Sequence, residues 1–188
     1  MRSLILHMHI SLDGFVAGLN GELNWITINE EIFDFVGMMT DKADTGVYGR
    51  KTYEIMQAYW PTAADKPNAT KHDKEHAVWY KNSAKIVLSK TMNDESFSNT
   101  SFIKENIRDY FNQLKNTKGK NMIIFGSPSA AESLLTEGLI DELMLFVNPI
   151  ILGKGISLFQ KNNETIKLKL IESKVFECGV ILLHYARP

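Results

Sequence analysis

The chain has 188 residues, of which 44% are hydrophobic, enough for a single domain with a substantial core over residues 1–188. A formal net charge of -1 without a basic run argues against a nucleic-acid partner and favours a small-molecule one. The single cysteine, Cys178, excludes an intrachain disulfide framework, and no apolar stretch is long enough to span a bilayer. We therefore expect a cytoplasmic protein with no membrane partner and no metal.

Short apolar runs alternate with longer segments of helical period, a pattern typical of α/β layering with a sheet buried on both faces. The last two runs flank Cys178-Gly179, which predicts a hairpin and therefore antiparallel final strands. The expected strands cover residues 4–10, 45–48, 84–89, 121–125, 142–147, 166–176 and 180–185.

Helical period predicts helices over residues 51–59, 103–114 and 129–137, the last stopped by Gly138. Asn29 is a candidate N-cap for a further helix. Its buried side would carry Ile32, Phe33, Phe35, Val36 and Met39. Between Trp60 and Asn82 the pattern weakens, and we interpret this segment as an insertion with a charged helix starting near Thr70. The residues that predict its loop are Pro61, Ala63, Ala64, Pro67 and Asn68.

Three strand ends carry glycine, serine or basic residues: Gly49-Arg50-Lys51-Thr52, Ser89-Lys90-Thr91 and Gly126-Ser127-Pro128-Ser129. Each alone is compatible with ordinary turn chemistry. Ligands of open α/β sheets lie outside the carboxyl ends of strands, where helix N-termini present free N–H groups to anions. With the glycine-rich segment 11–21, the three ends favour an extended anionic ligand such as a dinucleotide. The spacing matches neither a Rossmann fingerprint nor a P-loop.

Six motifs in order carry a resemblance to a known family. The chain resembles the dihydrofolate reductase-like superfamily, in the branch containing the C-terminal pyrimidine reductase domain of the bifunctional riboflavin biosynthesis protein, over almost its whole length. The motifs are Ser11-Leu12-Asp13-Gly14-Phe15-Val16-Ala17, Val47-Tyr48-Gly49-Arg50-Lys51-Thr52-Tyr53-Glu54, Lys85-Ile86-Val87-Leu88-Ser89-Lys90-Thr91, Ile123-Ile124-Phe125-Gly126-Ser127, Gly138-Leu139-Ile140-Asp141-Glu142-Leu143 and residues 149–159.

The resemblance implies an NADPH-dependent reductase with a three-layer α/β/α sandwich, a mostly parallel central sheet and an antiparallel C-terminal strand. It places Gly49, Arg50, Lys51 and Thr52 on the phosphate-binding turn, and Ser89 and Lys90 beside the ribose 2′-phosphate. The helix that takes the pyrophosphate would begin at Gly126, Ser127, Pro128, Ser129 and Ala130, and Ala17 would pack near the nicotinamide. Guanidinium and ammonium groups favour a phosphorylated ribose, which agrees with this assignment.

On the substrate side, the resemblance places Trp25 in the substrate wall and Glu30, or its neighbour Glu31, as the acid that assists protonation. Asp13 is the second candidate catalytic residue. A general acid needs a pKa raised by burial, whereas an acid in a first helical turn can equally be a solvated group favoured by the helix dipole. Trp25 can equally be a core aromatic.

The predicted activity is reduction of a heterocycle, as in 5-amino-6-(5-phosphoribosylamino)uracil reductase of riboflavin biosynthesis. Dihydrofolate or pteridine reduction and non-catalytic nucleotide binding are the alternatives. The chain has four arginines, Arg2, Arg50, Arg108 and Arg187, so an arginine-rich pocket for a ribose phosphate is not visible in the sequence. The cysteine motif of the deaminase half is also absent. The resemblance also implies a homodimer, to which the apolar stretch 143–152 contributes unless it is a buried strand.

Histidines offer two further patterns. His72 and His76 have helical i, i+4 spacing, but the charged residues around them favour a solvated helix face over a metal site. His7 and His9 share one face of the first strand, where core or cleft-edge positions are favoured over catalysis.

Overall fold

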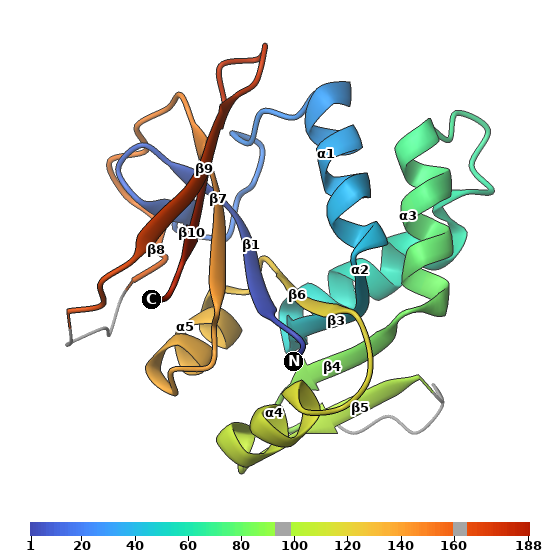
Figure 1. Ribbon diagram of the computed structural model, residues 1–188. Coiled ribbons are helices and arrows are strands. Elements are labelled where there is room, and N and C mark those ends of the chain that lie inside the picture. Colours follow the sequence, from blue (N-terminus) through green and yellow to red (C-terminus); the bar gives the residue numbers. More distant parts are fainter. Residues whose placement is uncertain (93–98, 160–164) are drawn as a thin grey trace.

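A computed structural model describes residues 1–92, 99–159 and 165–188, and an eight-stranded sheet lies at its centre (Figure 1). The strand order is β5-β4-β3-β6-β1-β7-β10-β9. Its strands are β1 (Leu4–Ser11), β3 (Ala43–Gly49), β4 (Ala84–Leu88), β5 (Thr100–Ile103), β6 (Asn121–Phe125), β7 (Glu142–Asn148), β9 (Lys169–Val175) and β10 (Ile181–Ala186). Two short strands, β2 (Phe15–Ala17) and β8 (Ile156–Ser157), form a separate antiparallel pair.

The sheet is parallel from β5 to β7, and β10 is antiparallel to both β7 and β9. The turn between the last two strands lies at Gly179, whose positive φ of 84° suits glycine. These pairings confirm the predicted mostly parallel sheet with antiparallel C-terminal strands.

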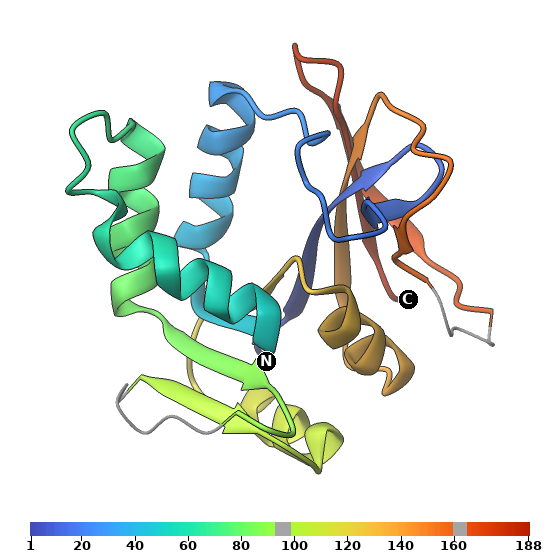
Figure 2. The ribbon, with the colours of Figure 1, turned by 180° about the vertical axis from the view of Figure 1, so that it is seen from behind.

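Helices cover both faces of the sheet, as the two opposite views show (Figures 1 and 2). Helices α1 (Glu30–Asp41), α2 (Arg50–Ala63) and α3 (Lys71–Asn82) lie on one side, and α4 (Ile107–Lys115) and α5 (Pro128–Thr136) on the other. The predicted three-layer sandwich is confirmed.

The two interfaces between sheet and helices differ in chemistry because successive side chains of a strand point to opposite faces. Leu6, Val47 and Ile124 enter an aliphatic core under α4 and α5. Their neighbours on the other face include Tyr48 and Phe125, which join a core rich in aromatic rings under α1, α2 and α3. His7 lies on this aromatic side, with its ring centroid 4.8 Å from that of Phe146.

The helix boundaries confirm some predictions and correct others. Asn29 caps α1 by accepting a hydrogen bond from the Ile32 N–H at 3.0 Å, and Thr70 caps α3, as expected. The predicted loop at Pro61 is wrong, because α2 continues through Ala63, whose fully buried side chain holds the last turn against the core. The predicted helix start at residue 103 is also wrong, since Ile103 ends β5.

The stretch 143–152 is mainly a buried strand. Strand β7 lies between β1 and β10, and Leu143, Leu145 and Phe146 are buried, whereas Ile151 is 69% exposed. Within the described ranges, no helix has the length and apolar character needed to cross a membrane.

Candidate functional site

The three strand ends singled out by the sequence meet at one edge of the sheet. Strand β3 lies between β4 and β6, and the three are parallel, so their carboxyl ends are neighbours. The Gly49 N–H donates to Ser127 Oγ at 2.8 Å, which joins the end of β3 to the turn after β6. This edge is where open α/β sheets bind ligands.

The approach of these two turns depends on backbone geometry. Gly126 and Ser127 have φ values of 54° and 58°, in the left-handed region that a serine rarely adopts. A Cβ built on Gly49 would overlap Ser127 Oγ, so the contact requires glycine at this position. Local strain and a close backbone approach therefore bring the first turns of α2 and α5 together.

Both of these helices begin without a side-chain cap. The N-cap residues are Gly49 for α2 and Ser127 for α5, neither of which makes a capping hydrogen bond, and no acidic residue lies in either first turn. Their terminal N–H groups and the positive ends of their dipoles remain available to an anion. Arg50 and Lys51 add two exposed cations at the start of α2.

Arg50 connects this turn to the end of β4. Its Nε donates to Glu54 Oε1 at 2.7 Å and its Nη1 to Thr91 Oγ1 at 3.3 Å. Ser89 Oγ in turn accepts the Met92 N–H at 3.0 Å, and Lys90 is exposed beside it. The structure thus brings together all three basic or glycine-marked segments that the sequence assigns to a cofactor.

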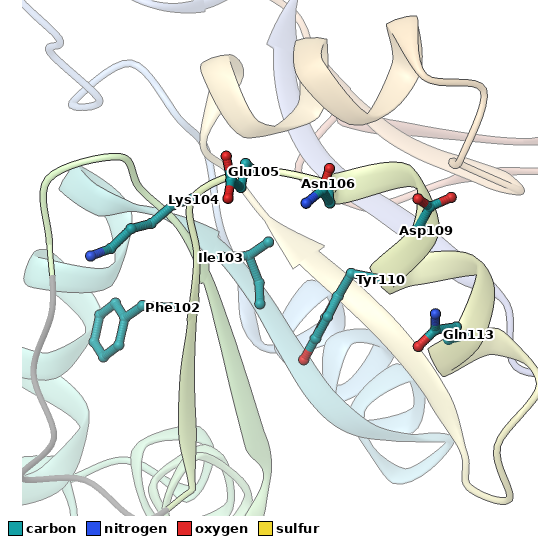
Figure 3. A pocket seen from close by; sticks show the side chains of 8 residues that line it. All are labelled: Phe102, Ile103, Lys104, Glu105, Asn106, Asp109, Tyr110 and Gln113. Atoms are coloured by element: carbon teal, nitrogen blue, oxygen red, sulfur yellow. The ribbon is translucent and has the colours of Figure 1, made fainter.

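A cavity of about 520 Å³ lies next along the same edge, at the end of β5 and the start of α4 (Figure 3). The backbone N–H of Ser89 donates to the Ile103 carbonyl at 3.1 Å, so the cavity adjoins the Ser89 turn. Its lining carries two carboxylates, Glu105 and Asp109, against one ammonium, Lys104, which suits neutral polar groups better than phosphate. Sequence reasoning missed this cavity because β5 was not recognised.

Asp13 lies in the loop after β1, and Ala17 ends the short strand β2 that follows. The Asp13 carboxylate accepts hydrogen bonds from the Ser11 hydroxyl at 2.6 Å and from the N–H groups of Leu152 and Gly153 at 3.1 and 2.7 Å. The Ser11 bond, followed by those backbone bonds, holds the pKa of Asp13 below its usual value. Asp13 therefore ties two loops together, and buried Ala17 pairs with Ile156 beside them.

The candidate acids at the start of α1 are not buried in a cleft. Glu30 is exposed and lines a cavity between α1 and α3. Glu31 accepts the Glu177 N–H and pairs with Lys174, both at 3.0 Å, and these contacts lower its pKa, opposite to the direction a general acid needs. Trp25 is half-buried, and its Nε1 donates to the Glu22 carbonyl at 3.0 Å.

The histidines are more buried than their sequence context suggests. The expected solvated face is wrong for His76, which is 5% exposed and lies against Trp60 and Phe125 because α3 packs that side against the sheet. Burial lowers the pKa of His7 and of His76 to about 3. Across the described part of the chain, no cluster of three histidine, cysteine or acidic side chains has metal-binding geometry.

Comparison with known proteins shows which family this chain matches. The chain matches the family described as RibD C-terminal domain over residues 2–182. It is 32% identical over 188 residues to "Uncharacterized protein YyaP" of Bacillus subtilis (strain 168), covering 98% of this chain and 94% of that protein.

Two solved structures share the fold. A putative riboflavin biosynthesis protein from Shewanella sp. PV-4 aligns with a TM-score of 0.75 at 24% identity, over 100% of this chain and 99% of that one. The Thermotoga maritima diaminohydroxyphosphoribosylaminopyrimidine deaminase/5-amino-6-(5-phosphoribosylamino)uracil reductase aligns with a TM-score of 0.68 at 16% identity, over 100% of this chain and 57% of that one. With the fold and the family match in agreement, this chain belongs to the RibD C-terminal domain family.

Proposed function

We propose that the chain binds NADPH along the carboxyl edge of its sheet and reduces a C=N or C=O bond of a heterocyclic small molecule. The observation that carries the proposal is that the first turns of α2 and α5 meet at this edge. Neither helix start has a side-chain cap or an acidic residue, and the cations Arg50 and Lys51 lie beside them. The name of the Thermotoga maritima relative includes a uracil reductase, which supports a pyrimidine as the substrate class.

The donor groups at this edge fit a phosphorylated dinucleotide. The N–H groups of Ser127, Ser129 and Ala130 at the start of α5 would hold the pyrophosphate, since Pro128 has no N–H, and Gly49, Lys51 and Thr52 would flank it. Arg50, which already reaches Thr91, would meet the 2′-phosphate together with Ser89 and Lys90. When bound, NADPH supplies the hydride; this chain's residues orient both ligands and exclude water.

Assignments on the substrate side follow from which groups are already engaged. Asp13 has its oxygens occupied by Ser11, Leu152 and Gly153, so its role is to position the loops beside Ala17 and the nicotinamide. Glu30 makes no such bonds within the described residues and stays the proposed source of the proton, with Trp25 in the substrate wall.

The arginine positions restrict the substrate further. Arg2 is buried against Asp44, Arg108 pairs with Glu137 at 2.7 Å, and Arg187 faces backbone carbonyls. Only Arg50 lies at the site, and the cofactor would use it. A substrate without a phosphate therefore fits this chain better than a ribose phosphate.

Fluorescence titration with NADPH and NADH tests the cofactor assignment. We expect tighter binding of NADPH, and a loss of roughly 100-fold or more in the double variant Arg50→Ala, Lys51→Ala, because each of the two charge-assisted contacts contributes about 1.5–3 kcal/mol. The matched control is Arg108→Ala, Lys71→Ala, which also removes an exposed arginine and a first-turn lysine. Equal affinity in both double variants would contradict the assignment.

A non-catalytic nucleotide-binding protein is the second candidate, favoured by the engaged carboxylates of Asp13 and Glu31. Absorbance at the NADPH band, measured with dihydropterins and aminouracils as substrates, separates the two. Oxidation with either class supports the reductase and identifies its substrate class, whereas tight NADPH binding without any oxidation supports the binding protein.

A further inference from the structure

His9 lies where the sheet opens beside the candidate site. Pairing between β1 and β6 ends at His7 and Phe125, while pairing between β1 and β7 continues to Ser11 and Asn148. After the Gly126 N–H donates to the His7 carbonyl at 3.2 Å, the chain turns away into α5. At His9, β1 therefore has no strand paired with it on the side where β6 lies. This unpaired position is next to the turn that leads into α5.

Asn148 fixes which ring nitrogen of His9 carries the proton. It is fully buried, its Oδ1 accepts the Thr27 N–H at 2.8 Å, and its Nδ2 donates to the Phe146 carbonyl at 3.0 Å. Nδ2 also donates to the Ile10 carbonyl at 3.3 Å, so backbone groups set the amide orientation. The same Nδ2 lies 3.3 Å from His9 Nδ1. Because a donor faces Nδ1, this nitrogen is assigned as the acceptor and the proton lies on Nε2.

The ring is also held in place and kept neutral. It stacks on Phe146 with centroids 4.9 Å apart and an interplanar angle of 25°, and it meets the edge of His7 at 5.6 Å. Burial lowers the pKa of His9 to about 4. Unlike Nε2 of His7, which is sealed without a partner, Nε2 of His9 belongs to a partly exposed side chain, and no hydrogen bond reaches it from any described residue.

We propose that His9 recognises the substrate, with its Nε2–H donating a hydrogen bond to a carbonyl oxygen or unprotonated ring nitrogen of the heterocycle. This inference rests on the proposed function and extends it to a specificity-determining residue. A neutral donor selects the acceptor edge of a ring over its amino groups, because an amino group would leave two donors facing each other. The bond from Thr27 to Asn148 ties this recognition to the segment that carries Trp25.

Two substitutions at His9 separate hydrogen bonding from packing. The glutamine amide nitrogen reaches about as far as imidazole Nε2, whereas the asparagine amide reaches only as far as Nδ1. With 5,6-diaminouracil, which carries no ribose phosphate, and 7,8-dihydrofolate as probes, we expect kcat/KM of His9→Asn to fall about 10-fold or more below that of His9→Gln. NADPH affinity should stay the same in both, and His184→Asn serves as the control.

Nitrogen-15 NMR of the histidine side chains tests the geometry without turnover. The free protein at neutral pH should show the Nε2–H tautomer of His9, and Asn148→Asp should shift it toward Nδ1–H by placing an acceptor there. The Nδ1–H tautomer in the wild type would overturn the inference whatever NADPH does.

The remaining outcomes separate the two proposals. If NADPH is oxidised with either probe but the glutamine and asparagine variants are equally impaired, only the role of His9 is overturned. If NADPH binds without turnover, a shift of the His9 Nε2 resonance on adding a probe supports the inference, and an unmoved resonance overturns it. If NADPH does not bind, the proposed function fails and the role of His9 falls with it.

Discussion

Two pairs of helix starts in this protein use opposite chemistry. Helices α1 and α3 begin with side-chain caps, Asn29 and Thr70, and carry acids in their first turns. Helices α2 and α5 begin at Gly49 and Ser127 without such caps or acids. Each cap of the first pair accepts one N–H of its helix, whereas the second pair leaves its first-turn N–H groups and positive dipole ends for an outside anion. The difference teaches that capping stabilises one pair, whereas the other pair keeps its N–H donors free at the edge where we propose that the cofactor binds.

The capped pair lies over the aromatic core, which it shares with α2. Helix α3 buries His76, and α1 packs Phe35 against Phe146, the ring that also contacts His7 and His9. The capped helices therefore cover the buried histidines of the sheet, while α5 covers an aliphatic core.

Lowering the pH should have the largest effect on stability, through the buried histidines under and within the capped helices α1 and α3. The pKa values of His7, His9 and His76 are lowered to about 3, 4 and 3, so the unfolded chain binds more protons than the folded one below about pH 6.5. Their contribution to stability is complete above that pH and is lost as pH falls toward 4 and 3. At about pH 5 the loss is roughly 2 kcal/mol per ring.

Urea unfolding followed by circular dichroism at neutral pH and near pH 5 measures this loss. His76→Phe, which removes one of the three rings, should flatten the pH dependence by about a third. An unchanged unfolding midpoint between the two pH values would show that the buried histidines are not held neutral.

A methyl group added at Gly49 tests the contact between the uncapped starts of α2 and α5. Gly49→Ala should displace Ser127 Oγ and break its hydrogen bond, lowering the free energy of unfolding by about 1–3 kcal/mol and weakening NADPH binding. Gly37→Ala, in the middle of α1, is the control, because its Cβ would meet only Glu75 Oε2 at 4.0 Å. That control should gain up to about 1 kcal/mol of stability, as measured by urea unfolding.

Acids added to the uncapped starts should separate stability from binding. Lys51→Glu and Ser129→Glu should each stabilise the protein by about 0.3–1 kcal/mol through the helix dipole. Both should weaken NADPH by about 10-fold or more in fluorescence titration, because a carboxylate then occupies the place of a phosphate. Ser133→Glu, one turn further along α5, should change NADPH affinity less, and an equal loss there would argue against a local effect.

Removing the caps should give the smallest effect. Asn29→Ala and Thr70→Ala should each cost about 1 kcal/mol of stability and leave NADPH affinity unchanged. Thermal unfolding and the same titration measure the two quantities. A loss of NADPH affinity in either cap variant would contradict the view that the capped helix starts contribute to stability and not to binding.

Local patterns predicted much of this architecture. The apolar runs, the cap at Asn29 and the turn at Gly179 correspond to observed elements. Strand β5 was missed because it has only four residues, none of them fully buried, so its alternation is weak. The sequence could not show that Pro61 lies within the last turn of α2, because the packing that holds Ala63 comes from outside the helix.

The amino-acid pattern by itself determined the layers and marked the strand ends that are candidates for an anionic ligand, because period, glycine and charge act within a few residues. Tertiary structure alone decided that Gly49 meets Ser127, 78 residues away, and that His9 meets Asn148, 139 residues away. It also decided which acids are engaged by loops and which histidines lose their charge. These outcomes depend on strand order and burial, which arise only when distant segments pack into one sheet.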